Sequence, residues 1–301
     1  EETDIFYCLG NHDSSNGSGA ALYAQELGDR FFQSAADRQE AAENGGNRHQ
    51  VYGGYHFLAV ECDYSIPERY TDATLRWVRT TLEKIVAQSD YSGEPIFVVT
   101  HSPVAGTTYG GNMDSARSLG EVLSDYPQTV LFAGHTHNPL NDERSIMQGD
   151  FTAVDTGTMY YICVESAGYL ADGGEVSYGS LRPADASAIS QGLYVEMDQA
   201  HNMRITRLDF YRDGRTIKNA WIVPAPDLKN KTHLLHYTKA RAFDKESPAF
   251  PGDGVPTAEV TGEDRLRVTV PSALDTDMVH HYEVELVQDA AAVSYTHLRA
   301  H

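Results

Sequence analysis

The chain has 301 residues and a formal net charge of −20 at pH 7, with 41% hydrophobic, 10% aromatic and 22% charged residues. This composition is that of a globular protein with a sizeable core, and it excludes extensive disorder. The negative charge argues against partners such as extended nucleic acid or anionic membranes, because both would be repelled. No apolar run approaches the ~20 residues of a membrane span, so we expect none in this chain.

Strands and helices are predicted to alternate from residue 5 to residue 133, which indicates a sheet covered by helices. The strongest helical pattern places Leu75, Val78 and Leu82 on one face, with Thr71 or Asp72 as the N-cap. Apolar runs predict strands at 5–9, 56–62, 96–100 and 129–133, and helical spacing predicts helices at 20–43, 71–89 and 115–126.

From residue 151 the pattern changes to closely spaced strands. An Asp213-Gly214 pair between two strand-like runs predicts a hairpin turn. The segment 167–190 is rich in Gly, Ala and Ser and is predicted to be a long surface loop. The predicted strands lie at 152–155, 160–165, 193–197, 203–210 and 217–223, and the Pro-Ala-Pro run at 224–226 is predicted to act as a linker.

The C-terminal part is predicted to begin an all-β sandwich domain. Residues 265–270 and 281–287 alternate strictly between apolar and polar side chains, as strands do, but a sandwich of this kind needs about 100 residues. Residues 293–301 change abruptly in character and resemble a translated sequencing-adapter read-through, so we set them aside. The predicted organisation is a first domain at 1–226, a partial β domain at 227–290 and a non-native tail at 291–301.

Three segments with histidines each follow an apolar strand-like run. They are 10–13 (Gly-Asn-His-Asp), 100–101 (Thr-His) and 134–137 (Gly-His-Thr-His). Ligands gather at the carboxyl ends of strands in such sheets, so the three segments should share one crevice. Imidazole nitrogens with amide or carboxylate oxygens suit Mn, Fe or Zn. The pattern therefore predicts a transition-metal site.

Each segment taken alone also has an ordinary structural interpretation. The alternation of a strand end would point His135 and His137 the same way, yet a His-x-His pair can equally be two exposed turn histidines. His12 could act as a general acid if Asp13 orients its ring, although Asn-His-Asp after Gly is also a common capped turn. A histidine such as His101 is often only a satisfied loop residue. Their joint occurrence in this order favours the site.

Together these segments resemble the last three of the five signature blocks of the calcineurin-like metallophosphoesterases, over residues 4–226. The resemblance implies an α/β fold, a four-layered α/β/β/α sandwich, with two divalent or trivalent metal ions (Mn, Fe or Zn) and a small phosphorylated substrate. It implies that His12 is catalytic and held by Asp13. The implied metal ligands are Asn11, His101 and His135 for one ion and His137 for the other.

The chain departs from the family pattern at its beginning. The first two blocks, Asp-x-His and Gly-Asp, should precede residue 10, but no Asp-x-His occurs anywhere and every Gly-Asp pair lies later in the chain. The chain also starts within a predicted strand. We therefore expect an N-terminally truncated fragment whose metallophosphoesterase sandwich is incomplete and which is itself inactive.

The C-terminal part resembles a fibronectin type III module in its Pro-Ser-Ala turn at 271–273 and its strand from residue 281. The combination resembles secreted or surface-attached bacterial phosphoesterases, so an extracytoplasmic location is expected. The predicted function is hydrolysis of phosphomonoesters or phosphodiesters. Two alternatives stay open: a nucleotide-specific phosphodiesterase or nuclease, and a non-catalytic surface-attached binding module with a vestigial hydrolase domain.

Overall fold

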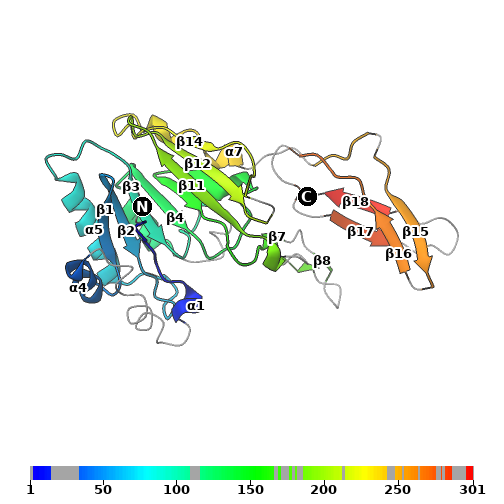
Figure 1. Cartoon of the computed structure of the whole chain (residues 1–301), viewed down its shortest axis with the longest axis horizontal. Helices are drawn as coiled ribbons and strands as arrows, with labels where there is room; N and C mark the ends of the chain where they lie inside the picture. Colours follow the sequence, from blue (N-terminus) through cyan, green and yellow to red (C-terminus); the bar gives the residue numbers. More distant parts are fainter. Residues whose placement is uncertain are drawn as a thin grey trace.

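The protein has a mixed α/β fold with a central sheet and additional β-sheets, as Figure 1 shows. The computed structural model describes residues 3–14, 34–108, 116–165, 169–170, 176–177, 180–181, 186–211, 214–242, 248–252, 254–263, 265–275, 279, 282–286 and 296–300. Within these residues, no helix is long and apolar enough to cross a membrane.

A six-stranded sheet in the order β1-β2-β3-β4-β6-β5 forms the centre of the fold. Strands β2, β3, β4 and β6 run parallel, and β1 and β5 are antiparallel strands at the two edges. Three of the predicted strands, 96–100, 129–133 and 152–155, are confirmed residue for residue. The strands are β1 (Arg48–Tyr52), β2 (Tyr55–Val60), β3 (Ile96–Thr100), β4 (Thr129–Ala133), β5 (Ile146–Gln148) and β6 (Thr152–Asp155).

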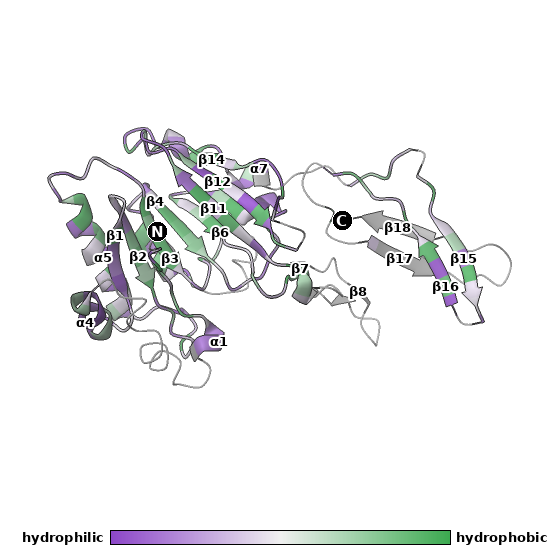
Figure 2. Ribbon diagram, viewed as in Figure 1, coloured by the Kyte–Doolittle hydropathy of each residue, from purple (hydrophilic) through white to green (hydrophobic). Residues whose placement is uncertain are grey.

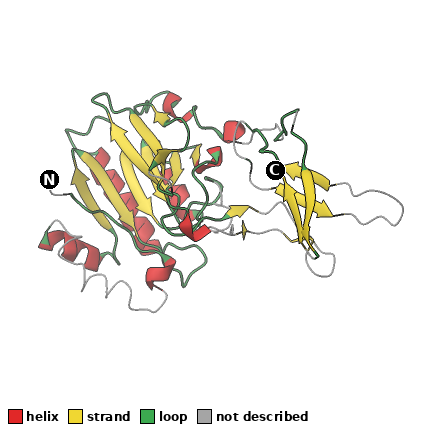
Figure 3. Ribbon diagram, turned by 45° about the vertical axis from the view of Figure 1, so that its right-hand side comes forward, coloured by secondary structure: helices red, strands yellow, loops and turns green. Residues whose placement is uncertain are grey.

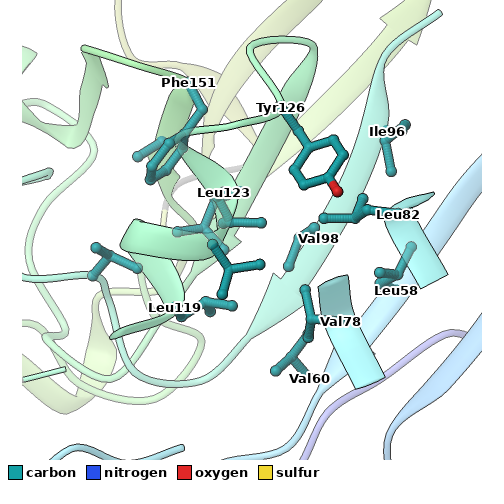
Figure 4. Close-up of a cluster of buried hydrophobic side chains, with 14 of the residues drawn as sticks. Leu58, Val60, Val78, Leu82, Ile96, Val98, Leu119, Leu123, Tyr126 and Phe151 are labelled. Carbon is teal, nitrogen blue, oxygen red and sulfur yellow. The ribbon is translucent and has the colours of Figure 1, made fainter. Parts of the chain in front are cut away.

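Helices α5 (Asp72–Val86) and α6 (Ser118–Leu123) cover one face of this sheet. The predicted N-cap is confirmed, since the Thr71 side chain accepts a hydrogen bond from the amide of Thr74. The apolar stripe of α5 packs on the sheet through Val78 and Leu82, which are fully buried. Figure 4 shows this first core, in which residues of β2 and β3 meet those of α5 and α6.

A second sheet packs on the opposite face and forms a third layer. It contains β11 (Gln191–Met197), β12 (Met203–Asp209), β13 (Arg215–Thr216) and β14 (Trp221–Val223). Buried apolar side chains of both sheets form the second core. Figure 2 shows the apolar strands, and Figure 3 shows the helices that lie on the other face of the central sheet. The expected fourth layer would be helical. Among the described residues that follow these strands, the longest helix is α7 (Lys239–Ala242).

A partly buried carboxylate ties the second sheet to the loop after β4. Glu143 accepts hydrogen bonds from Arg207 at 2.8 Å, from the Trp221 indole at 3.0 Å and from Arg241 at 2.9 Å. The side chain of Arg207 is 1% exposed and stacks over the Trp221 ring. Burial opposes the ionised form of Glu143, but these partners outweigh it and hold its pKa below the ordinary value.

The predicted strand at 5–9 is wrong, because the described N-terminal segment pairs with side chains and not with a neighbouring strand. The Leu9 amide donates to the carboxylate of Glu61 at 3.0 Å, and the Tyr7 carbonyl accepts from Arg48. Phe6 packs edge-on against rings of the β1–β2 hairpin. The segment is therefore attached to the sheet by side-chain contacts and is not one of its strands.

Other predicted elements are shorter than expected or fall outside the described residues. The predicted helix 20–43 is seen only as α4 (Ala35–Glu43), and its first part lies outside the described residues, as does Asp213 of the predicted hairpin turn. The predicted strand 160–165 is reduced to β7 (Val164–Glu165). Within the predicted loop 167–190 the structure has β8 (Tyr169–Leu170), β9 (Val176–Ser177) and β10 (Ser180–Leu181).

The C-terminal part contains two antiparallel strand pairs. β15 (Thr257–Gly262) pairs with β16 (Arg265–Thr269), and β17 (Tyr282–Leu286) pairs with β18 (Thr296–Ala300). The predicted strands at 265–270 and 281–287 correspond to β16 and β17. β18 lies in the segment that we set aside as a non-native tail, so residues 296–300 of this segment are paired in the structure. The division into these three parts stays a prediction.

Candidate metal centre

The candidate site lies where the parallel strands of the central sheet end side by side. The strand register aligns the last residues of β2, β3, β4 and β6, which are Val60, Thr100, Ala133 and Asp155. The residues that follow therefore leave the sheet at one edge, as predicted from the three histidine-bearing segments. The N-terminal segment reaches the same edge through its hydrogen bond to Glu61, the residue after β2.

Three predicted metal ligands meet at this edge. The amide oxygen Oδ1 of Asn11 lies 3.0 Å from Nε2 of His101, and Nδ1 of His135 lies 3.2 Å from the same nitrogen. The rings of His101 and His135 meet edge to face with centroids 5.0 Å apart, and the Tyr64 ring packs beside both. An amide oxygen and two imidazoles thus converge from segments 34 and 90 residues apart.

The electrostatics of His101 reflect its neighbours. The pKa of His101 falls to about 4, first because burial disfavours the imidazolium and then because His135 lies close. His137 and His12 lower this pKa further, whereas Asp13 raises it. The neutral imidazole that results is the form that binds a metal. All the other predicted histidines and Asp13 therefore act on His101.

Residues 134–137 form a tight turn and not the strand end that the sequence suggested, since β4 ends at Ala133. His135 and His137 have positive backbone φ angles of 72° and 57°. This left-handed conformation costs a non-glycine residue roughly 1–2 kcal/mol. The turn is anchored where the Gly134 amide donates to the His101 carbonyl at 3.0 Å. Arg69, His201 and Lys231 share this conformation elsewhere, but such strain at two predicted ligands of one turn is typical of functional sites.

His137 is fixed by the segment that follows β6. Its Nδ1 lies 2.8 Å from the backbone carbonyl of Tyr161 and 3.2 Å from the hydroxyl of Thr158, and the Tyr161 ring stacks on the imidazole with centroids 4.0 Å apart. A carbonyl can only accept, so Nδ1 carries the proton and the lone pair is on Nε2. This arrangement orients metal-binding histidines in proteins.

The predicted catalytic pair lies on a short helical turn, α1 (Asn11–Ser14). His12 is exposed there, so it is accessible to a substrate. The Asp13 carboxylate accepts a hydrogen bond from the Gly10 amide at 2.8 Å, which caps the turn. The predicted hold of Asp13 on the His12 ring stays a prediction.

Gly10 is required by a close approach. A Cβ atom built at this position would lie 2.8 Å from Cε1 and 2.9 Å from Nδ1 of His101, well inside normal contact. A larger residue would displace the imidazole or the Asn11 segment. The glycine thus makes room for the ring of a predicted ligand.

Sequence reasoning missed several residues that shape the site. Glu61 follows β2 as His101 follows β3, and burial raises the pKa of its carboxyl to about 7. Asp155, at the end of β6, is fully buried, which raises its pKa to about 7 as well. Both are acidic residues at the end of an apolar run, a signal that could have found them. Nothing local in the sequence marks Tyr64 or Tyr161.

The donors fit one transition-metal ion in part. Two imidazoles and an amide oxygen are ligands that such ions accept. Among the described residues, no three His, Cys, Asp or Glu side chains are grouped so that they could hold an ion. A second ion would have His137 as its predicted ligand.

The mixed α/β sheet with donors at its parallel strand ends is consistent with a metallophosphoesterase fold. Comparison with protein families agrees, since the model of the calcineurin-like phosphoesterases matches residues 2–139, which include all six predicted site residues. Neither the curated proteins nor the solved structures gave a match. The family match supports metal-dependent hydrolysis of phosphoesters in general, and none of the comparisons supports the fibronectin type III resemblance.

Proposed function

We propose that the first domain binds two transition-metal ions and acts on phosphoesters of small molecules. The convergence of Asn11, His101 and His135 within 3.2 Å at the strand ends carries this proposal. The net charge of −20 disfavours long polyanions but leaves small phosphorylated compounds as substrates.

The proposed roles follow from the position of each side chain. Asn11, His101 and His135 would hold one ion, and His137 would hold the other through Nε2. When bound, such ions polarise the phosphoryl group and generate a nucleophile from water. His12, exposed on α1, would protonate the leaving oxygen. Asp13 keeps α1 in place through the Gly10 amide.

Metal binding tests the proposal most directly. Titration of the chain with Co²⁺ should give the visible absorption of a nitrogen-ligated ion, and His101→Ala should weaken binding at least tenfold, the lower end of what the loss of site groups costs. His236→Ala is the matched control, because His236 is exposed and lies outside the site. Absence of binding, or binding that His101→Ala leaves unchanged, would overturn the proposal.

Hydrolysis is the second test. With Mn²⁺ present, we expect at most slow turnover of a chromogenic mono- or diester, because the sequence contains no Asp-x-His block. The slow activity should be lost in His12→Ala while Co²⁺ binding is retained. Robust turnover would contradict the expected inactivity of this chain.

The alternative is a vestigial site in a non-catalytic binding module. The two functions differ in the behaviour of the metal-loaded chain. If the wild-type chain binds Co²⁺ but hydrolyses esters no faster than His12→Ala, the domain is a binding module. Calorimetry with inorganic phosphate would then test whether the metal-loaded chain binds phosphate.

A further inference from the structure

We propose that Asp155 is a positioning residue that acts through Thr136 to hold His135 and His137 in the geometry of the site. The proposal rests on the proposed function, since it assigns those histidines to metal binding. It adds a residue that contacts neither ion nor substrate and that lies on β6, a strand with none of the predicted ligands.

A continuous chain of hydrogen bonds joins β6 to the histidine turn. The hydroxyl of Thr136 donates to Oδ2 of Asp155 at 2.6 Å, and the Gly157 amide donates to Oδ1 at 2.8 Å. The Asn138 amide donates to the Thr136 hydroxyl at 3.4 Å. Asp155 and Thr136 are 1% and 6% exposed. Each carboxylate oxygen therefore accepts one bond in a site that water does not reach.

The position of Thr136 explains what these bonds do. Thr136 lies between the two residues with left-handed backbone, so its side chain fixes the middle of a strained turn. Asp155 itself cannot shift easily, because the next residue is tied to β4: the amide and the hydroxyl of Thr156 both donate to the Ala133 carbonyl, at 2.8 Å and 3.1 Å. The bonds thus connect a rigid strand end to the histidine backbone.

The chemistry favours a carboxylate at this position. Both oxygens of Asp155 face donors, a hydroxyl on one side and a backbone amide on the other. In Asp155→Asn, one oxygen would become an NH₂ group that cannot accept. Thr136→Val removes the hydroxyl at nearly constant shape, and Thr136→Ser restores it. The conservative variant should therefore rescue whatever the valine variant loses.

Buried hydrogen bonds also stabilise the fold, so the test needs a control for that role. Thr152 is such a control: it lies at the other end of β6, is 1% exposed, and its hydroxyl accepts from Gln148 at 3.1 Å. Thr152→Val should lower the melting temperature without changing the histidines. Thr136→Val should do both.

Two measurements decide the question. In the metal-free chain, long-range ¹H–¹⁵N spectra should show the ring signals of His135 and His137 shifted by Thr136→Val, restored by Thr136→Ser and unaffected by Thr152→Val. In Co²⁺ titrations, Thr136→Val should weaken binding by about tenfold or more, as loss of groups that orient ligands does. If Asp155→Asn fails to fold, the Thr136 pair still decides.

The failures are distinguishable. If the wild-type chain binds no Co²⁺, the proposed function fails and the ring spectra alone judge the role of Asp155. If the wild type binds and His135→Ala loses binding, but Thr136→Val keeps wild-type affinity and spectra, only the positioning role is overturned.

Discussion

The carboxyl of Glu61 should make the stability of the fold depend on pH, and Glu61→Gln should remove the share of that dependence that Glu61 causes. Burial raises the pKa of this carboxyl from 4.5 to about 7, which the hydrogen bond from Leu9 and the charge of Arg48 only partly offset. A glutamine oxygen can still accept the bond from the Leu9 amide. The substitution therefore removes the titration and keeps the contact.

The sign follows from proton linkage. Between pH 4.5 and about 7 the native chain holds a proton on Glu61 that the unfolded chain has released. Unfolding then releases a proton, so the free energy of unfolding falls as the pH rises through this window. With 1.36 kcal/mol for each pKa unit, the loss is about 3 kcal/mol at most.

Urea unfolding between pH 5 and 8 measures this effect, followed by the fluorescence of the two tryptophans. The wild type should lose stability across the range. Glu61→Gln should lose less and be the more stable protein at pH 8, because only the loss caused by other groups, such as Asp155 with its raised pKa, remains. Glu83→Gln, an exposed substitution on α5, should follow the wild type. Parallel curves for wild type and Glu61→Gln would refute the reasoning.

Two further predictions concern individual contacts of the structure. Gly10→Ala should weaken Co²⁺ binding by about tenfold, because its Cβ would press on the His101 ring. The control Gly149→Ala has open space around its Cβ and should bind like the wild type, and a Gly10→Ala variant with wild-type Co²⁺ affinity would contradict the close approach. Glu143→Gln should destabilise the fold by about 3 kcal/mol, measured by urea unfolding, because the buried charge of Arg207 would lose the carboxylate that it pairs with. A destabilisation below about 0.5 kcal/mol, which is typical of surface substitutions, would refute this prediction.

The strands of the central sheet could be predicted because their signal is local. The runs at 96–100 and 129–133 are apolar on both faces, as strands covered by helices on one side and a second sheet on the other must be. The edge strand β1 was missed because it lacks this apolar signal. Its sequence Arg-His-Gln-Val-Tyr is largely polar, and its pairing with β2 in a hairpin is what makes it a strand.

The predicted strand 5–9 failed because the sequence cannot reveal what a strand-like run pairs with. Its backbone groups meet the side chains of Glu61 and Arg48, which are 52 and 41 residues away from their partners. Membership in a sheet is a long-range property.

The candidate site shows the same division between local and distant information. Strand ends that are level in a parallel sheet bring their following residues together, so His101 and His135 could be placed in one site from sequence. Asn11 reaches the same site from a segment that is not a strand of the sheet. The residues that aim these ligands could not. Asp155 acts through a threonine 19 residues away. Its role depends on the parallel pairing of β4 with β6, which no local pattern records.

The turn at 134–137 illustrates why the correct residues were reached through an incorrect geometry. Strand alternation would have turned Thr136 away from the site, toward solvent or the opposite face. In the structure His135 and His137 both have a left-handed backbone conformation, and the Thr136 hydroxyl donates to the buried carboxylate of Asp155. A two-residue spacing of histidines is therefore compatible with a strand end and with a left-handed turn. Only the turn requires a buried acceptor for the hydroxyl of the threonine between the histidines. That requirement makes Thr136→Val more informative about this site than replacement of either histidine.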